Sequence, residues 1–236
     1  MTILYGSLGS GFAVLGADRH VPGVGTSGEQ IPMSLLKLFV HPRLPLAVAA
    51  AGMGAFQLER RARFQSTTTE IIEAVLMNVP PRELSIERVV DKLVKKFLRL
   101  VVASRKDPRW SLLGVQGVDF MIAMMTTAGP RVSILRITNR VENFSGPGEA
   151  ILRPPCLEAF YATGTYAPDG DAARTQLAPG PACERAKTAI DEGIAAERQL
   201  HAEPMHAGRP IDVAMIDKLG ARMVDFDTRE RPASTS

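Results

Sequence analysis

The chain has few cysteines and no long apolar run. Its 236 residues include two cysteines, Cys156 and Cys183, which form neither a Cys-x-x-Cys pair nor a disulfide framework. The best apolar run, Leu46 to Ala51, is far shorter than the roughly 18 residues that a membrane helix needs. No lysine or arginine precedes Arg19, so the basic start of a signal peptide is missing. We therefore expect a reduced, cytoplasmic protein that makes no contact with a membrane.

An excess of one charge is also missing. Lysine and arginine total 28 and aspartate and glutamate 25, which gives a formal net charge of +3. The basic residues are evenly spread, whereas a surface that follows nucleic-acid phosphates needs them concentrated. We therefore do not expect a nucleic-acid partner.

Motifs for cofactors and metals are absent as well. Gly6, Gly9 and Gly11 have the reverse of the dinucleotide-loop spacing, and a strand-like segment follows them where a helix should begin. The sequence contains no phosphate-binding P-loop, no H-E-x-x-H among its four histidines and no G-x-S-x-G elbow. We expect neither a cofactor nor a metal ion.

Short apolar segments joined by glycine or proline turns predict three hairpins. The paired segments are residues 2–8 with 12–18, 36–41 with 44–51, and 118–126 with 131–138. Two helices are expected between the second and third hairpins. One is the segment from Phe56 to Met77, which lacks glycine and proline, and the other is the amphipathic repeat from Ile86 to Val101 behind the N-cap Ser85.

The remaining segments complete one domain. We expect a loose loop over residues 21–31, an irregular stretch before a short strand at 159–164, a helix over 181–200 and a strand over 211–216. Because strands precede helices in runs, the order favours an α+β protein in which two antiparallel sheets carry a helix layer on each outer side. The domain is expected over residues 1–224, followed by a polar, mobile tail over 225–236.

The start of the chain offers a nucleophile. Threonine is small enough at position 2 for Met1 to be excised, which leaves Thr2 as the first residue. Its Oγ can then attack a carbonyl, and its α-amine, with a reference pKa of about 7.7–8.0, can act as general base. Thr follows Met in many ordinary proteins, so this position carries weight only together with its neighbours.

Three further residues are suited to support that nucleophile. Asp18 ends the strand that pairs with the first one, and Lys37 begins the second hairpin at the same end of the expected sheet. A buried lysine held by an aspartate would lower the pKa of Thr2. Gly52 lies between a strand and a helix, where a backbone N–H can face an oxyanion. A turn aspartate, a solvated lysine and a helix-entry glycine are the structural alternatives.

Several short blocks occur in a fixed order over roughly residues 2–217. They are Thr2 behind Met1, Gly16-Ala-Asp-Arg19, Lys37-Leu-Phe39, Ala50-Ala-Gly-Met53 with Phe56-Gln-Leu-Glu-Arg60, Ala162-Thr-Gly-Thr165 and Gly208-Arg-Pro-Ile-Asp-Val-Ala-Met-Ile216. In combination they resemble proteasome β-type subunits and their bacterial HslV relatives, including the proteasome homologue of betaproteobacteria.

The resemblance implies the four-layer αββα sandwich of the N-terminal-nucleophile hydrolases. It implies Thr2 as nucleophile and base, Asp18 and Lys37 as the supporting charge pair, and the Gly52 N–H as oxyanion donor. The hydroxyl of Thr165 takes the place of a family serine that hydrogen-bonds the terminal amine.

The same resemblance implies a substrate pocket and partners. Phe39, Ala50 and Gly54 would border the pocket for the residue before the cleaved bond, and the small residues 50 and 54 would leave it roomy and apolar. Family members form stacked homo-oligomeric rings, here expected to be heptameric, which degrade unfolded polypeptides delivered by an ATP-dependent unfoldase.

One departure from the family leaves the activity open. Pro204 and Ala207 stand where family members usually carry an Asp and a Ser that orient the amine, and Glu197 could substitute if the alignment shifts. Two alternatives therefore remain beside a threonine endopeptidase. One is a ring or scaffold protein that has lost turnover, and the other is a small-molecule amidase.

Overall fold

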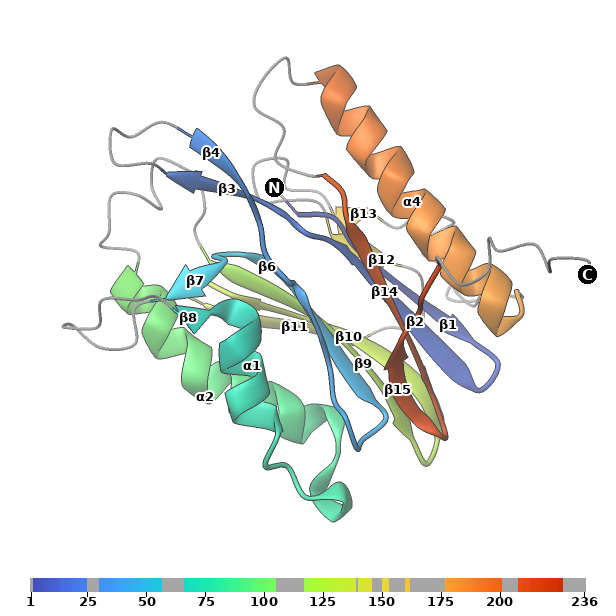
Figure 1. The fold of residues 1–236 in the computed structure, drawn as a ribbon. Helices are drawn as coiled ribbons and strands as arrows, with labels where there is room; N and C mark the ends of the chain where they lie inside the picture. The colour runs from blue at the N-terminus through green and yellow to red at the C-terminus, as the bar shows by residue number, and fades with distance from the viewer. Residues whose placement is uncertain are drawn as a thin grey trace, which may run out of the picture.

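The structure is a computed structural model, and it describes most of the chain. The described residues are 2–24, 30–56, 66–104, 117–138, 140–145, 150–152, 160–161, 177–200 and 208–226. Within them the chain forms a mixture of helices and antiparallel sheets (Figure 1).

The larger sheet has six strands in the order β13-β12-β1-β2-β14-β15. Its strands are β1 (Leu4–Gly9), β2 (Phe12–Asp18), β12 (Ala150–Leu152), β13 (Phe160–Tyr161), β14 (Ile211–Asp217) and β15 (Gly220–Met223). The hairpin of β1 and β2 pairs Leu4 with Ala17 and Gly9 with Phe12. Its turn contains Gly11, whose φ of +82° is a conformation that glycine adopts without strain.

The second sheet has five strands in the order β11-β10-β9-β6-β5. Its strands are β5 (Leu38–Val40), β6 (Leu46–Gly52), β9 (Val118–Thr126), β10 (Gly129–Ile137) and β11 (Val141–Ser145). Two small sheets pair β3 (His20–Val24) with β4 (Gln30–Ser34), and β7 (Ala55–Phe56) with β8 (Ser66–Thr67). The three predicted hairpins are thus confirmed.

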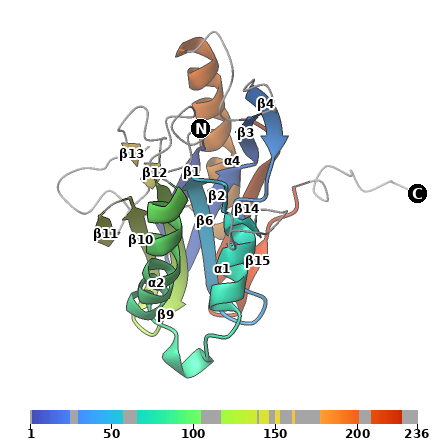
Figure 2. The ribbon, with the colours of Figure 1, turned by 90° about the vertical axis from the view of Figure 1, so that its left-hand side faces the viewer.

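The helices pack on the outer faces of the two sheets. They are α1 (Thr68–Leu76), the 3₁₀ turn η1 (Pro81–Glu83), α2 (Ile86–Ser104) and α4 (Pro179–Leu200). Figures 1 and 2 show α1 and α2 against the five-stranded sheet and α4 on the far side of the six-stranded sheet. Both views place the start of β1 and the β3–β4 hairpin at one end of the molecule and η1 at the opposite end.

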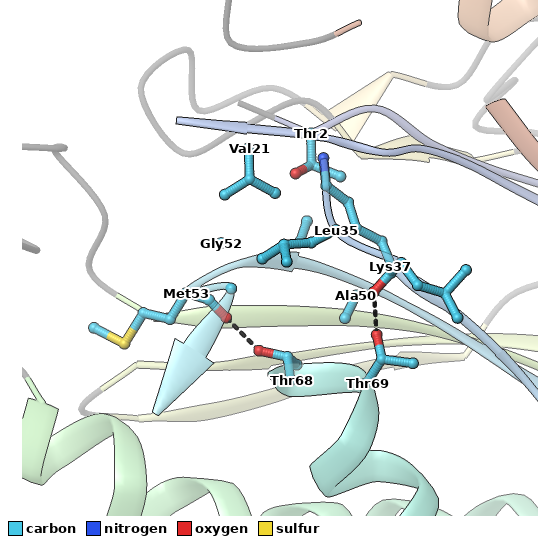
Figure 3. A pocket seen from close by; sticks show the side chains of 12 residues that line it. Thr2, Val21, Leu35, Lys37, Ala50, Gly52, Met53, Thr68 and Thr69 are labelled. Carbon is cyan, nitrogen blue, oxygen red and sulfur yellow. Dashed lines mark hydrogen bonds between the residues drawn. The ribbon is translucent and has the colours of Figure 1, made fainter. Parts of the chain in front are cut away.

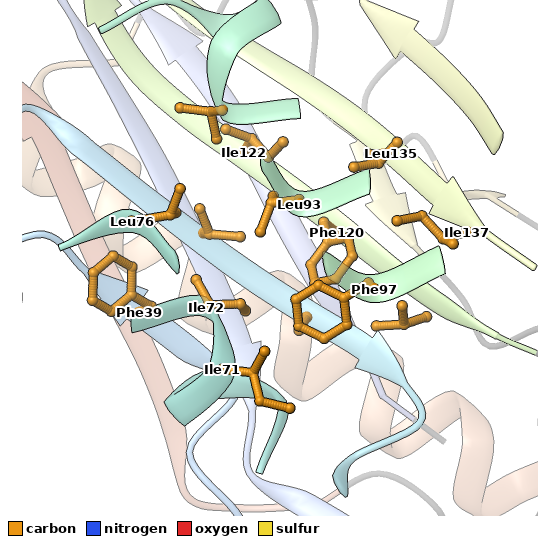
Figure 4. Close-up of a cluster of buried hydrophobic side chains, with 14 of the residues drawn as sticks. Phe39, Ile71, Ile72, Leu76, Leu93, Phe97, Phe120, Ile122, Leu135 and Ile137 are labelled. Carbon is orange, nitrogen blue, oxygen red and sulfur yellow. The ribbon is translucent and has the colours of Figure 1, made fainter. Parts of the chain in front are cut away.

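Three buried apolar clusters lie between these layers. The cluster beneath α1 and α2, called the α1/α2 cluster below, is drawn in Figure 4. Its labelled members are Phe39, Ile71, Ile72, Leu76, Leu93, Phe97, Phe120, Ile122, Leu135 and Ile137. Phe97 meets Phe120 edge to face with 4.8 Å between ring centroids, a favoured aromatic geometry. Small residues such as Ala47, Ala49 and Ala123 fill the space between the two sheets.

The expected helix from Phe56 to Met77 was wrong at its start. Helix α1 begins at Thr68, and Phe56 belongs to strand β7; residues 57–65 lie outside the described part. Thr67 caps α1, since its side chain accepts from the Glu70 N–H while the Glu70 carboxylate accepts from the Thr67 N–H. This capping box was readable in the sequence and is a stronger start signal than the absence of glycine and proline.

Some of the other predicted segments differ from the observed strands and helices, and some agree with them. The loop expected over residues 21–31 contains most of β3 and the first two residues of β4, because paired extended segments tolerate the prolines and glycines that suggested a loop. Strands β11, β12 and β15 were not predicted. Helices α2 and α4 and strand β14 are confirmed, with Ser85 accepting from the Arg88 N–H at the start of α2. Of the expected tail, Phe226 packs on α4, where Lys187 Nζ lies 4.7 Å from its ring centroid.

Candidate active site

The first hairpin brings Asp18 beside the start of the chain. The β1–β2 register continues beyond Leu4 and Ala17, so that the Asp18 N–H donates to the Ile3 carbonyl at 3.3 Å. In return the Ile3 N–H donates to Asp18 Oδ1 at 2.7 Å. This pair of bonds fixes residue 3, and therefore holds Thr2 at the end of the sheet.

The Asp18 carboxylate is fully buried, with 0% of the residue exposed. Its second oxygen, Oδ2, accepts from the His20 N–H at 3.1 Å, the Gly208 N–H at 3.2 Å and Lys37 Nζ at 3.1 Å. A buried carboxylate is stable only when such donors replace water. Asp18 thus joins β1, the loop before β14 and the segment before β5 at one point.

Lys37 reaches this point from the other sheet. It precedes β5, and its own carbonyl accepts from the Ala50 N–H on β6 at 2.8 Å. Its ammonium group donates to Asp18 and to the His20 carbonyl, and the residue is 5% exposed. A buried ammonium without such partners would carry a large desolvation cost.

Thr2 and Lys37 face the same small cavity (Figure 3). The figure shows the amino group of Lys37 pointing toward the side chain of Thr2, which is 6% exposed. The residues that line the cavity are Thr2, Val21, Leu35, Leu36, Lys37, Ala50, Ala51, Gly52, Met53, Gly54, Thr68 and Thr69. The structure therefore brings together Thr2, Asp18, Lys37 and Gly52, the four predicted catalytic residues that lie in the described part of the chain.

Gly52 ends β6 in a conformation that requires glycine. Its φ is +91°, and a Cβ there would lie 2.3 Å from the Gly117 carbonyl oxygen. That carbonyl accepts from the Met53 N–H at 2.9 Å. Gly117 has a similar constraint, because a Cβ on it would lie 2.2 Å from the Ile137 carbonyl. The backbone segments that contain Gly52, Gly117 and Ile137 therefore approach one another closely.

The structure places the three residues of the expected substrate pocket in two different surroundings. Ala50 and Gly54 line the cavity, but Phe39 does not. Phe39 packs into the α1/α2 cluster and contacts the ring of His41. The cavity is also not roomy. Its volume is about 20 Å³, which is space for about one water molecule, because Val21 and Leu35 fill the room left by Gly54.

Sequence reasoning missed two threonines at the start of α1. The Thr68 hydroxyl donates to the Met53 carbonyl at 2.5 Å, and the Thr69 hydroxyl donates to the Leu36 carbonyl (Figure 3). The capping box at Thr67 and Glu70 would have placed both residues in the first turn of a helix. Nothing local in the sequence indicates that this turn lies against residues 36 and 53.

Several predicted residues lie outside the described part of the chain. They are Thr165, Pro204 and Ala207, and the same holds for the side chain of Glu197. Among the described residues no group of three histidine, cysteine, aspartate or glutamate side chains could hold a metal ion. Within the same residues no helix is long and apolar enough to cross a membrane.

Comparison with known proteins adds no assignment. No protein-family model matches the chain, and no curated protein matches it.

Proposed function

We propose that the chain is a threonine peptidase of the N-terminal-nucleophile hydrolase class, with the αββα fold of that class, and that Thr2 is its nucleophile after Met1 is removed. One observation carries the proposal. The buried carboxylate of Asp18 binds both the Ile3 N–H next to Thr2 and the ammonium of Lys37. A hydroxyl, an ammonium and a glycine-rich backbone turn therefore share one cavity.

The chemistry follows from this arrangement. In the full chain the nitrogen of Thr2 is a peptide amide, so it becomes a base only when Met1 is gone. The free amine then accepts the Thr2 Oγ proton, directly or through one water, while Oγ attacks the substrate carbonyl. The Lys37 ammonium stabilises the developing alkoxide, and the Gly52 N–H donates to the oxyanion.

The second half of the cycle releases both products. As the tetrahedral intermediate collapses, the peptide C–N bond breaks and the leaving amine takes the proton held by the Thr2 amine. An ester between Thr2 and the acyl part of the substrate remains. A water molecule, deprotonated by the same amine, attacks the ester carbonyl. The bond between this carbon and Thr2 Oγ breaks, Oγ takes the proton back from the amine, and the acyl part leaves as a carboxylic acid.

The assembly belongs to the same proposal. By resemblance the protein acts in the cytoplasm as stacked homo-oligomeric rings on unfolded polypeptides, with an ATP-dependent unfoldase as the delivering partner. The cavity has room for about one water molecule, which is too little for a substrate side chain. This favours a second candidate, which is a ring protein of the same fold without peptidase turnover.

The test compares Thr2→Ala with the parent chain on unfolded casein and on short fluorogenic peptides. We expect a loss of at least about a thousandfold in kcat/KM, because the variant lacks the attacking oxygen. An intact mass shows whether Met1 is absent. Equal turnover by both proteins would refute the mechanism, and a processed Thr2 that forms no adduct with a β-lactone would favour the second candidate.

A further inference from the structure

We infer that Thr68 and Thr69, which no sequence motif marked as functional, are positioning residues that hold the two halves of the Thr2 site together. The inference rests on the proposed function for its catalytic consequence. Both residues are buried, with 4% and 7% exposed, and each hydroxyl donates to the backbone of a different segment.

Thr68 fixes the backbone that follows Gly52. Its hydroxyl donates to the Met53 carbonyl at 2.5 Å, and its N–H donates to the Gly54 carbonyl at 2.9 Å. The Met53 N–H in turn donates to Gly117 at 2.9 Å. The backbone after Gly52 is therefore bound on both sides. Because Gly52 has a positive φ and no side chain to pack, these bonds hold the peptide group that follows it, next to the peptide group that carries its own N–H.

Thr69 fixes the backbone next to Lys37. Its hydroxyl donates to the carbonyl of Leu36, the residue before Lys37, and the Lys37 carbonyl accepts from the Ala50 N–H at 2.8 Å. The backbone of Lys37 is thus fixed at both of its peptide groups. From that fixed base its side chain reaches Asp18 and the His20 carbonyl.

The two anchors are neighbours in the first turn of one helix. Helix α1 is itself fixed by Ile71 and Ile72, which are buried in the α1/α2 cluster. Its packing therefore sets the distance between the ammonium that supports Thr2 and the N–H that receives the oxyanion. Effective catalysis depends on such distances to well under 1 Å.

The first test needs no enzymatic activity. It compares Thr68→Val, Thr69→Val and the matched control Thr67→Ala by amide hydrogen exchange of the full chain. Loss of a hydroxyl that fixes local backbone should raise exchange about tenfold or more at Met53 in Thr68→Val and at Ala50 in Thr69→Val. Thr67→Ala should accelerate exchange in the first turn of α1 and leave Met53 and Ala50 at parental rates. Parental exchange at Met53 in Thr68→Val and at Ala50 in Thr69→Val would overturn the inference.

The second test separates positioning from general stability. Thr68→Val should lower kcat about tenfold or more with KM within about twofold, because the oxyanion donor acts in the transition state. Its labelling by a β-lactone, which passes through an oxyanion, should fall more than its labelling by a peptide vinyl sulfone, which does not. Thr68→Ser should restore both.

Thr67→Ala should keep parental kcat and parental labelling ratios although it lowers stability. If Thr68→Val and Thr67→Ala behave alike in kcat and in labelling ratio, the catalytic part of the inference is wrong. A parent chain that neither cleaves peptides nor labels at Thr2 refutes the proposed function instead, and the exchange rates then decide the positioning by themselves.

Discussion

The Thr2 end of the molecule and the α1/α2 cluster are both buried, but they are held together by different forces. At the Thr2 end, one carboxylate accepts four hydrogen bonds, and neighbouring glycines allow backbone segments to approach closely. In the α1/α2 cluster the contacts are apolar and include two edge-to-face aromatic pairs, Phe56 with Phe97 and Phe97 with Phe120.

The two regions differ in how strongly their stabilising interactions depend on direction. Apolar burial is proportional to area and has little angular preference, so a cluster tolerates side chains of similar volume. Hydrogen bonds to a buried charge depend on individual atoms, and removal of one partner leaves the other without water or counter-charge. We therefore expect single-atom changes to matter at the Thr2 end and volume changes to matter in the cluster.

The largest effect is expected for Asp18→Asn. The substitution keeps the shape of the side chain but leaves the ammonium of Lys37 buried without its counter-charge. We expect the free energy of unfolding to fall by about 3–5 kcal/mol, measured by urea denaturation. The control is Asp91→Asn, whose ion pair with Lys95 is exposed on both sides, with 41% and 73% of the two side chains exposed, so that a loss near 1 kcal/mol or less is expected. Equal losses in the two variants would contradict the comparison.

Gly52→Ala should have the next largest effect. The added Cβ would meet the Gly117 carbonyl oxygen at 2.3 Å and would occupy a positive φ. Gly220→Ala is the matched control, because Gly220 also has a positive φ, of +138°, but no atom lies within 4 Å of its Cβ position. Backbone strain alone costs about 1–3 kcal/mol, so Gly52→Ala should lose more stability than the control in thermal unfolding. A loss no greater than that of Gly220→Ala would show that the close approach is unimportant.

Ile122→Val probes the α1/α2 cluster with the loss of one methylene group. Ile122 is fully buried. We expect a loss of about 0.5–1.5 kcal/mol in urea denaturation and unchanged kcat per folded molecule. A change in kcat as large as that of a site variant would mean that the two regions are not separable.

The smallest effect is a pH dependence at His41, which lies at the edge of this cluster. Burial lowers the pKa of His41, Arg43 lowers it further and the Leu76 carbonyl partly offsets both. The unfolded chain therefore takes up a proton at higher pH than the folded chain does. The contribution to stability is complete above the unfolded pKa of about 6.5 and is lost as the pH falls toward the lower folded value. Between pH 7 and 5 the parent should lose more stability than His41→Gln, and parallel curves would contradict this.

Much of the fold was predictable because its signals are local. The three hairpins, α2 and α4 follow from apolar periodicity and turn residues within each segment. The β3–β4 hairpin and the short edge strands were not predictable in this way. Strands β3 and β4 pair with each other, but their glycines and prolines indicate a loop when read alone, and β12 pairs with β1, which is distant in the sequence.

The candidate site likewise has a part that local sequence signals predicted and a part that they did not. Asp18 lies beside the chain start because the register of a single hairpin places it there. Phe39 was placed in the pocket by resemblance, yet its side chain packs into the α1/α2 cluster. The size of the cavity was not predictable either, since Val21 and Leu35 come from segments whose positions no spacing in the sequence reveals.

The sequence by itself determined which groups are available and which short segments pair locally. The groups are the threonine behind Met1, an aspartate, a lysine and several turn glycines. Only the tertiary structure decided that Lys37 crosses from the second sheet to Asp18 and that α1 presents Thr68 and Thr69 to both sides of the cavity. The reason is physical. Local pairing depends on residues a few positions apart, whereas the site forms where the packing of two sheets and a helix brings distant backbone together and removes water from it.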